Sequence, residues 1–288
     1  MRIALGGNRY GKSGIRLVKV TRHADRHDLA DLTVDLWLEG DFDAAHTAGD
    51  NAAILPTDTM LATVYALAKT GSVEEIEAFG LRLAERFLDA APAASRATVA
   101  ISAEPWTRMT VAGEPHPHAF ARLGGGRRTV EVARTRDQTR VTAGVADLTI
   151  LKSAGSAFSG FLTDEFTTLP ETDDRILATA LTAAWRYGDG DGEVDWGDSA
   201  EAVRRVLLET FAVHDSRSVQ HTLYAMGEAV LAARPEVEAV RLTMPNKHHL
   251  PVDLGPYGLA NDNEVFVAAD RPFGAIEGTV VRAGAAPW

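Results

Sequence analysis

The chain has 288 residues, a length that fits about two ordinary domains. Hydrophobic residues make up 45% of the chain, enough for packed cores and too many for a globally disordered protein. The formal net charge of −11 argues against a general binder of nucleic acid or acidic membranes, and the absence of cysteine excludes disulfides, thiolate catalysis and thiolate metal sites.

The first predicted elements form a strand pair. The glycine-rich segment from Ile3 to Lys12 does not have the spacing of a phosphate-binding loop, and we expect a turn that presents Lys12. The stretch from Gly14 to His23 is rich in β-forming residues, and apolar residues alternate with polar ones from Leu32 to Leu38. A short polar connection joins the two, which predicts an antiparallel hairpin.

Two helices and two strands follow. Pro56 disfavours helical geometry at the residue before it, and Thr57 or Asp58 is expected to cap a helix from Met60 to Lys69. A second helix is expected after Ser72, because apolar residues recur at helical spacing. Its predicted buried face consists of Ile76, Phe79, Leu83 and Phe87. The two strands are predicted at Thr98 to Ser102 and at Thr107 to Ala112.

The second half begins after the three glycines at 124–126. The predicted strands are 129–134, 141–153, 237–244 and 264–269, and the predicted helices are 175–186, 200–213 and 218–233. The Gly/Asp-rich segment 187–196 is expected to be a solvated loop. Its acidic residues do not follow the pattern of an EF-hand calcium loop.

Two stretches of the chain resemble each other. Leu55 to Thr63 matches Leu169 to Thr179 after short insertions, and in both cases a Pro-broken strand pattern comes later in the chain. We therefore expect a tandem duplication, with modules at 1–124 and 125–288. The first module reads strand–strand–helix–helix–strand–strand (ββααββ), and two such halves in tandem predict an α+β fold of antiparallel sheets with helices on one face. The other face would be solvated or covered by further subunits.

No stretch is long and apolar enough to span a bilayer, and the N-terminus lacks the apolar core of a signal peptide. We expect a cytoplasmic protein.

The residues able to do chemistry are scattered. The neighbours His248 and His249 are expected to point to opposite faces of a strand, which makes a shared metal ion improbable. Other candidates are polar residues beside turns and one phenylalanine in a flexible segment, each of which also has an ordinary structural interpretation. They are Lys12, Thr57, Asp58, Phe158, Arg175, Gln220, Asn246 and His248. Sequence spacing alone does not bring them together.

These residues lie in segments that resemble the urate oxidase (uricase) family. The matching segments are 10–12, 50–59, 63–65, 158–169, 174–177, 218–220 and 244–248, in order along nearly the whole chain. The resemblance implies the tunnelling fold, built from tandem ββααββ modules. It also implies a homotetramer whose sheets close a barrel around a central tunnel, with active sites between subunits.

The resemblance implies an enzyme that oxidises urate with O₂ and water to 5-hydroxyisourate and hydrogen peroxide, the first step of urate degradation, without a metal or organic cofactor. By the same resemblance, Arg175 and Gln220 would bind the edge of urate and Phe158 would stack on its ring. Asn246 and Thr57 would hold O₂ or water. The main-chain groups of Asp58 and Val219 would complete the pocket.

Lys12, Thr57 and His248 match the family's proton relay. A lysine next to a threonine hydroxyl lowers the cost of removing its proton, and a histidine can pass protons onward. Two alternatives stay open. The first is another purine- or pterin-handling enzyme of the same fold, and the second is a purine-binding protein without catalytic activity.

Overall fold

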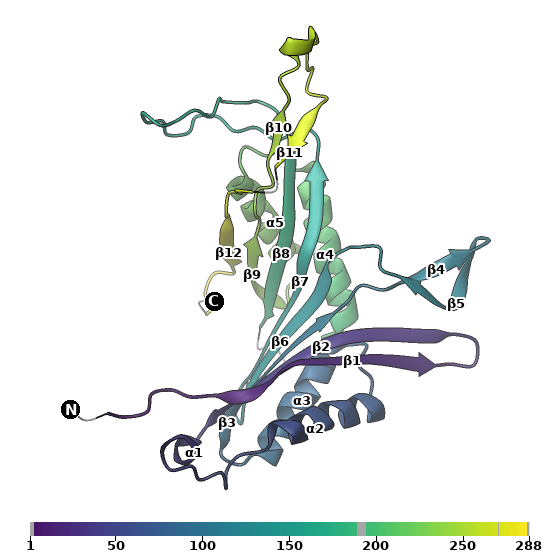
Figure 1. Cartoon of the computed structure of the whole chain (residues 1–288), viewed down its shortest axis with the longest axis vertical. Coiled ribbons are helices and arrows are strands. Elements are labelled where there is room, and N and C mark those ends of the chain that lie inside the picture. The colour runs from purple at the N-terminus through teal and green to yellow at the C-terminus, as the bar shows by residue number, and fades with distance from the viewer. Residues whose placement is uncertain (1–2, 189–193, 270, 287) are drawn as a thin grey trace. The chain divides into compact units, whose positions relative to one another are not determined.

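The computed structural model describes residues 3–188, 194–269, 271–286 and 288 (Figure 1). The chain divides into two compact units: unit 1 is Met1–Gly144 with Asp191–Gly197, and unit 2 is Val145–Gly190 with Asp198–Trp288. The boundary falls within strand β7 (Thr139–Lys152) rather than after residue 124. The extent of the repeated modules stays a prediction.

Unit 1 is an antiparallel sheet with helices packed against it (Figure 1). Its sheet has the order β1-β2-β3-β6. The elements are β1 (Tyr10–Arg22), β2 (His27–Gly40), α1 (Asp43–Thr47), α2 (Thr57–Thr70), α3 (Ile76–Ala90), β3 (Ala94–Ala103), β4 (Thr107–Val111), β5 (Glu114–Ala121) and β6 (Arg127–Thr135). The predicted hairpin of the first two strands is confirmed, with Leu17 opposite Leu32 in its register.

The core of unit 1 lies between α3 and the sheet. All four residues predicted to form the apolar face of α3 are fully buried: Ile76, Phe79, Leu83 and Phe87. On the facing sheet, Leu36 pairs with Val99 and Val99 pairs with Val132. Gly80 lets the helix approach, because a Cβ at that position would lie 2.9 Å from Val132.

The strand predicted at Thr107 to Ala112 is confirmed as β4. The segment Thr107–Val111 does not extend the sheet but pairs with β5 in a separate hairpin. Its place beside β3 is taken by β6, which the sequence had assigned to the second half. Local β propensity identified both segments as strands but carries no information on which strand pairs with which.

Unit 2 contains the antiparallel strand order β8-β9-β12. Its elements are the greater part of β7, then β8 (Leu177–Tyr187), α4 (Trp196–Val213, which begins in unit 1), α5 (Val219–Ala233), β9 (Val237–Thr243), β10 (His249–Pro251), the 3₁₀ turn η1 (Gly255–Tyr257), β11 (Phe266–Ala268) and β12 (Glu277–Val281). The strands β10 and β11 form a small hairpin of their own. The segment 187–196 predicted as a loop includes 189–193, which lie outside the described residues.

The helix predicted at 175–186 is instead strand β8. Most of its side chains are buried, so the strand has no polar face and its sequence lacks the alternation that marks a half-exposed strand. Ladder pairing with β9 decides the conformation. The similarity between Leu55–Thr63 and Leu169–Thr179 therefore aligns a helix with a strand, and it no longer supports a duplication. Both units still contain the order strand, strand, helix, helix, strand, and the tandem origin stays a prediction.

Helix α5 packs very closely on β9 and β12 because two glycines leave room for it. A Cβ at Gly227 in α5 would lie 2.6 Å from Val280, and a Cβ at Gly278 in β12 would lie 2.9 Å from Leu223. Ordinary side chains at these positions would push the helix away from the sheet. The close packing at Gly227 and Gly278 thus fixes the distance between α5 and the sheet.

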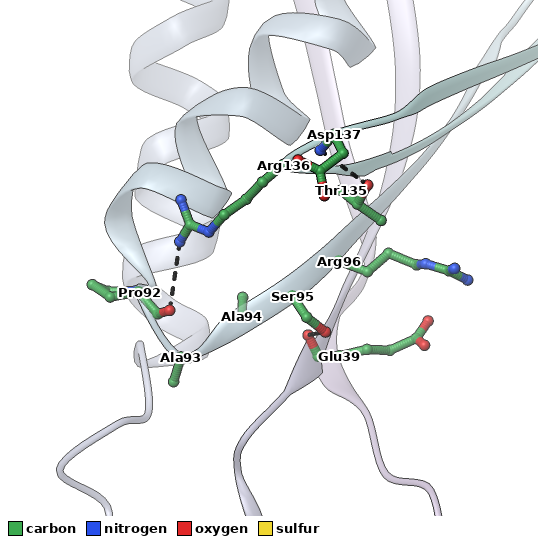
Figure 2. Close-up of a pocket in the computed structure, with 9 residues that line it drawn as sticks. All are labelled: Glu39, Pro92, Ala93, Ala94, Ser95, Arg96, Thr135, Arg136 and Asp137. Atoms are coloured by element: carbon green, nitrogen blue, oxygen red, sulfur yellow. Dashed lines mark hydrogen bonds between the residues drawn. The ribbon is translucent and has the colours of Figure 1, made fainter.

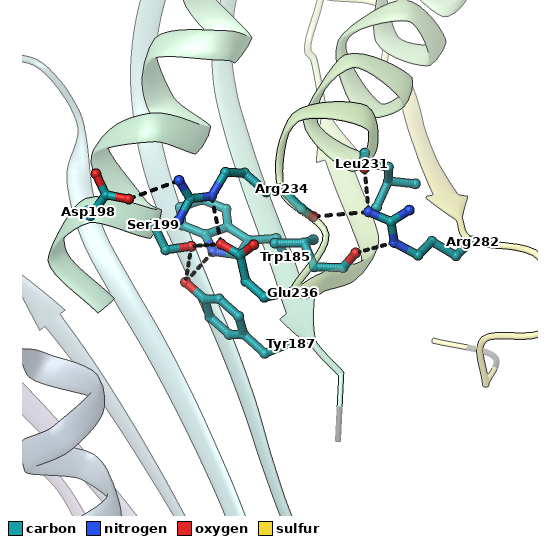
Figure 3. A network of polar contacts seen from close by, with 9 residues as sticks. Trp185, Tyr187, Asp198, Ser199, Leu231, Arg234, Glu236 and Arg282 are labelled. Carbon is teal, nitrogen blue, oxygen red and sulfur yellow. Dashed lines mark hydrogen bonds and ion pairs between the residues drawn. The ribbon is translucent and has the colours of Figure 1, made fainter. Parts of the chain in front are cut away.

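A polar network fastens the other end of unit 2 (Figure 3). Buried Tyr187 accepts a hydrogen bond from Trp185 (3.0 Å) and donates to Ser199 of α4 (3.2 Å). Ser199 donates to Glu236 (2.8 Å), which also pairs with Arg234 (2.6 Å). The network links β8, the start of α4 and the turn between α5 and β9, so it anchors α5 at the end opposite to Val219 and Gln220.

Within the described part of the chain, no helix has the length and continuous apolar character needed to cross a membrane.

Candidate active site

Lys12 lies inside β1 rather than at the predicted turn. The preceding residue, Gly11, faces the backbone of β2 so closely that a Cβ would lie 1.8 Å from the carbonyl oxygen of Leu36. A register shift follows between Lys12 and Ile15, and Gly14 adopts a φ of +69° there. The bulge re-aims the strand, and the Lys12 ammonium donates a hydrogen bond to Asp58 Oδ1 at 3.2 Å.

Thr57 and Asp58 are the first two residues of α2. The predicted side-chain cap is wrong: Pro56 occupies the N-cap position, and no side chain caps this helix. The two side chains are therefore not spent on the helix's own amides. The Asp58 side chain is 91% exposed, and Thr57 is half-buried. The chain entering the helix is held by Tyr10, whose hydroxyl accepts a hydrogen bond from the Leu55 N–H (2.9 Å).

Phe158 and Arg175 are in contact in unit 2. The segment bearing Phe158 is fixed by two backbone hydrogen bonds with Thr172, of 2.8 and 3.0 Å. The Phe158 ring stacks on that of Phe161, with centroids 4.9 Å apart. The guanidinium carbon of Arg175 lies 5.0 Å from the centroid of the Phe158 ring, within the range of a cation–π contact.

The Arg175 guanidinium has hydrogen-bonding capacity to spare. Burial lowers its pKa, because the charged form has lost solvent. Its Nε atom is buried and has no hydrogen-bond partner within the described structure. A desolvated cation with an unsatisfied donor is costly, and a planar anion with two acceptors on one edge would relieve that cost.

The first turn of α5 carries Val219 and Gln220. Ser218 caps the helix by accepting a hydrogen bond from the His221 N–H at 3.1 Å. Val219 is buried and Gln220 is exposed, so the glutamine amide is available to a ligand. The backbone N–H groups of a first helical turn are also available, since they have no partner in the helix.

Asn246 lies on an extension of β9. Its N–H donates to the Gly274 carbonyl (2.9 Å), and the next N–H, of Lys247, donates to Ala178 (2.9 Å). Two residues later the carbonyl of His248 accepts a hydrogen bond from Ala269 at 2.8 Å. Asn246 is therefore held by β8 on one side and by an isolated bridge to Gly274 on the other, and His248 lies at the base of the β10–β11 hairpin.

The nine predicted site residues divide between the units. Unit 1 holds Lys12, Thr57 and Asp58, and unit 2 holds Phe158, Arg175, Val219, Gln220, Asn246 and His248. Direct contacts join Lys12 to Asp58 and Arg175 to Phe158. Among the described residues, no three histidine, aspartate or glutamate side chains gather as metal ligands.

Sequence reasoning missed two residues next to the predicted site. Tyr10 holds the entry to α2, and it was visible only as part of the segment 10–12. Thr179 pairs with Asn246 across two strands, and it was missed because its segment had been assigned to a helix.

An open pocket of about 590 Å³ lies elsewhere in unit 1 (Figure 2). Its lining comes from the end of β2, the turn before β3 and the first residues of β3, and the end of β6 with the turn after it, namely Glu39, Pro92, Ala93, Ala94, Ser95, Arg96, Thr135, Arg136 and Asp137. The charges are mixed, and Arg136 donates to the Pro92 carbonyl at 3.5 Å. None of the predicted site residues lines this pocket, so we do not assign the substrate to it.

Comparison with known proteins is informative over nearly the full chain. The model of the family described as uricase matches residues 8–133 and 141–277. The chain is 46% identical to the uricase of Arthrobacter globiformis, over 98% of this chain and 91% of that protein. It is 39% identical to the uricase of Emericella nidulans, with 95% and 96% covered. The crystal structure of the Arthrobacter globiformis uricase superposes with a TM-score of 0.93 at 44% identity, covering 100% of this chain and 98% of that one.

Proposed function

The chain belongs to the uricase family, and from this premise we propose that it catalyses the oxidation of urate by O₂ and water to 5-hydroxyisourate and hydrogen peroxide. The reaction balances, because O₂ takes two electrons and two protons to become hydrogen peroxide, and water supplies the hydroxyl oxygen of the product. The proposed enzyme uses no metal or organic cofactor, since urate's electron-rich anion is itself the reductant.

The observation that carries the proposal is the pair of Arg175 and Phe158. The arginine is partly desolvated, it has a buried donor without a described partner, and it packs over an aromatic ring. A planar heterocyclic anion meets all three conditions: its edge accepts hydrogen bonds from the guanidinium, and its face stacks on Phe158. The exposed amide of Gln220 would read the urate edge, because it offers both a donor and an acceptor.

We assign proton transfer to Lys12, Thr57 and His248. The Thr57 hydroxyl would withdraw a proton from urate, Lys12 would favour the deprotonated hydroxyl by its charge, and His248 would pass protons onward. The position of Lys12 supports this role, because its ammonium reaches the first turn of α2, where it pairs with Asp58. The freedom of the Thr57 side chain from any capping duty supports it as well.

The remaining residues would complete the pocket. Asn246 and Thr57 would hold O₂ or water above the ring, where N–H and O–H donors stabilise negative charge as it develops on oxygen. The main-chain groups of Asp58 and Val219 would bind the substrate. We propose a homotetramer with active sites between subunits, in which residues of unit 1 from one subunit meet residues of unit 2 from another. The cytoplasmic location also stays a prediction.

The direct test is an assay of purified, metal-stripped protein with urate in aerated buffer. Loss of the ultraviolet absorbance of urate together with an equal amount of peroxide is the expected result. A tetramer that binds urate but forms no peroxide would support a purine-binding protein instead. Activity that returns only with added metal would support a metal-dependent relative.

A further inference from the structure

Thr179 presents an unexplained hydroxyl in the core of unit 2. The residue is fully buried on β8, and its Oγ1 atom has no hydrogen-bond partner among the described residues. A buried hydroxyl without a partner is destabilising, and such groups are rare in native proteins. A valine would fill the same volume without the free-energy cost of an unpaired buried hydroxyl, which points to a functional role of this group.

The strand register places Thr179 next to Asn246. The two residues form an antiparallel bridge that continues the register of β8 and β9. The flanking Lys247 N–H donates to the Ala178 carbonyl, which makes Thr179 and Asn246 a non-hydrogen-bonded pair. In such pairs the two side chains are on the same face, with Cβ atoms roughly 4.5–5.5 Å apart, so a hydroxyl and an amide can meet.

The shared face is the one that α5 covers. Asn246 is in phase with Leu242 on the same strand, and Leu242 pairs with Gly278. A side chain added at Gly278 would meet Leu223 of α5, so this face points toward the helix. Gln220 and Val219 lie on the first turn of the same helix. The Thr179 hydroxyl is thus on the side of the sheet where the proposed site is built.

The backbone of Asn246 is fixed, so only its side-chain torsions remain to be set. The strand carrying Thr179 holds one side, and Gly274 holds the other through a 2.9 Å backbone hydrogen bond. A Cβ at Gly274 would lie 3.4 Å from the Ile276 Cδ1 and 3.7 Å from the Asn246 Cβ, so the side chain next to that flank is apolar and offers no hydrogen bond to the amide. The neighbouring group that can orient the amide is therefore on the Thr179 side.

We propose that Thr179 is a positioning residue for the oxidation: its hydroxyl, which has no partner within the described structure, donates a hydrogen bond to the Asn246 side-chain carbonyl when urate binds, and turns the NH₂ group toward the oxygen species. This inference rests on the function proposed above. The chemistry needs this orientation, because negative charge develops on O₂ as it is reduced, and an N–H donor stabilises it whereas a carbonyl oxygen repels it.

The test compares Thr179→Val with Thr179→Ser. The valine variant keeps the shape but loses the hydroxyl, so kcat is expected to fall about tenfold while anaerobic affinity for urate stays unchanged. The serine variant keeps the hydroxyl and is expected to retain most of the turnover. In an Asn246→Ala background, Thr179→Val should cause no further loss of kcat, because the group that it orients is gone.

The outcomes separate cleanly. If the wild-type protein oxidises urate and Thr179→Val has the same kcat, this inference alone is overturned. It is also overturned if Thr179→Val lowers kcat by the same factor in the Asn246→Ala background as in the wild type. A wild-type tetramer that forms no peroxide would overturn the proposed function and this inference with it. If the valine variant does not fold, a crystal structure of the wild-type protein with urate bound under anaerobic conditions decides: a Thr179–Asn246 side-chain hydrogen bond supports the inference, and separated side chains overturn it.

Discussion

The two units contribute opposite kinds of surface to the proposed active site. In unit 2, Arg175 is partly desolvated against Phe158, and Asn246 is held between β8 and Gly274 under α5. In unit 1, Lys12 and Asp58 form an ion pair whose carboxylate is 91% exposed. The residues proposed to recognise substrate are thus partly buried within one chain, whereas the carboxylate beside the proposed reactive residues is in water, where charges are strongly screened. This difference fits a site that is enclosed only when subunits assemble.

The variant expected to have the largest effect on the proposed difference between the two units is Thr57→Ala. If unit 1 supplies chemistry rather than recognition, turnover should fall about 10²–10³-fold while anaerobic urate affinity stays the same. Steady-state kinetics and equilibrium binding measure the two effects separately. Thr63→Ala is the matched control on the same helix, because the Thr63 hydroxyl only bonds the Thr59 carbonyl. Equal losses of turnover and affinity in Thr57→Ala would contradict the assignment.

The reciprocal test is Arg175→Ala. We expect urate affinity to fall roughly 10–100-fold, because charge-assisted hydrogen bonds from a partly buried arginine are lost. Arg175→Lys should retain only part of the wild-type affinity for urate, since an ammonium group cannot bind the edge of urate through two parallel hydrogen bonds. Arg136→Ala, at the other pocket of unit 1, is the control. Unchanged affinity in Arg175→Ala would remove the arginine from the binding site.

The rigid base of the unit 2 site can be tested with Gly227→Ala. The added Cβ would lie 2.6 Å from Val280, and we expect the free energy of unfolding to fall by about 1–3 kcal/mol despite the better helix propensity of alanine. Denaturant unfolding measures the change. Gly7→Ala, where the new Cβ would have nothing within 4 Å, is the control and should be near neutral. Equal stability in both variants would show that the close approach of α5 is dispensable.

The smallest expected effect concerns His214, the residue that directly follows α4. Burial lowers its pKa, with His221 and Lys152 acting in the same direction and Asp215 opposing them. The unfolded chain therefore binds more protons than the folded one, so stability is lost as the pH falls through the ordinary histidine pKa of about 6.5 toward the lower folded value. His214→Gln should flatten this slope in unfolding experiments across that range, and exposed His46→Gln should not. A slope that persists in His214→Gln would assign it to other groups.

The fold was predictable where burial leaves a periodic signal. Helix α3 has one apolar face, and strand β2 alternates, so both were identified from spacing. Strand β8 is mostly buried and carries small or apolar residues on both faces, so its sequence lacks the apolar–polar alternation of a half-exposed strand and resembles a helix. The pairing of β3 with β6 rather than β4 depends on contacts between distant segments, and local propensity does not report them.

The site was predictable as a set of residues but not as an arrangement. The resemblance named Lys12, Arg175 and Asn246, yet no spacing indicates that Lys12 pairs with Asp58 or that Arg175 packs over Phe158. Thr179 shows the limit most clearly. Its relation to Asn246 exists only through the register of two strands, one of which had been assigned to a helix.

The division of labour between the units is tested most directly by mixing two impaired variants, Thr57→Ala and Arg175→Ala, letting their subunits exchange, and assaying at a urate concentration too low for the Arg175→Ala site to bind it. If each site takes unit 1 from one subunit and unit 2 from another, mixed tetramers contain some sites with neither substitution. Urate oxidation should then return to a substantial fraction of the wild-type rate. Mixtures that remain as inactive as the separate variants, with exchange verified, would show that each chain completes its own site.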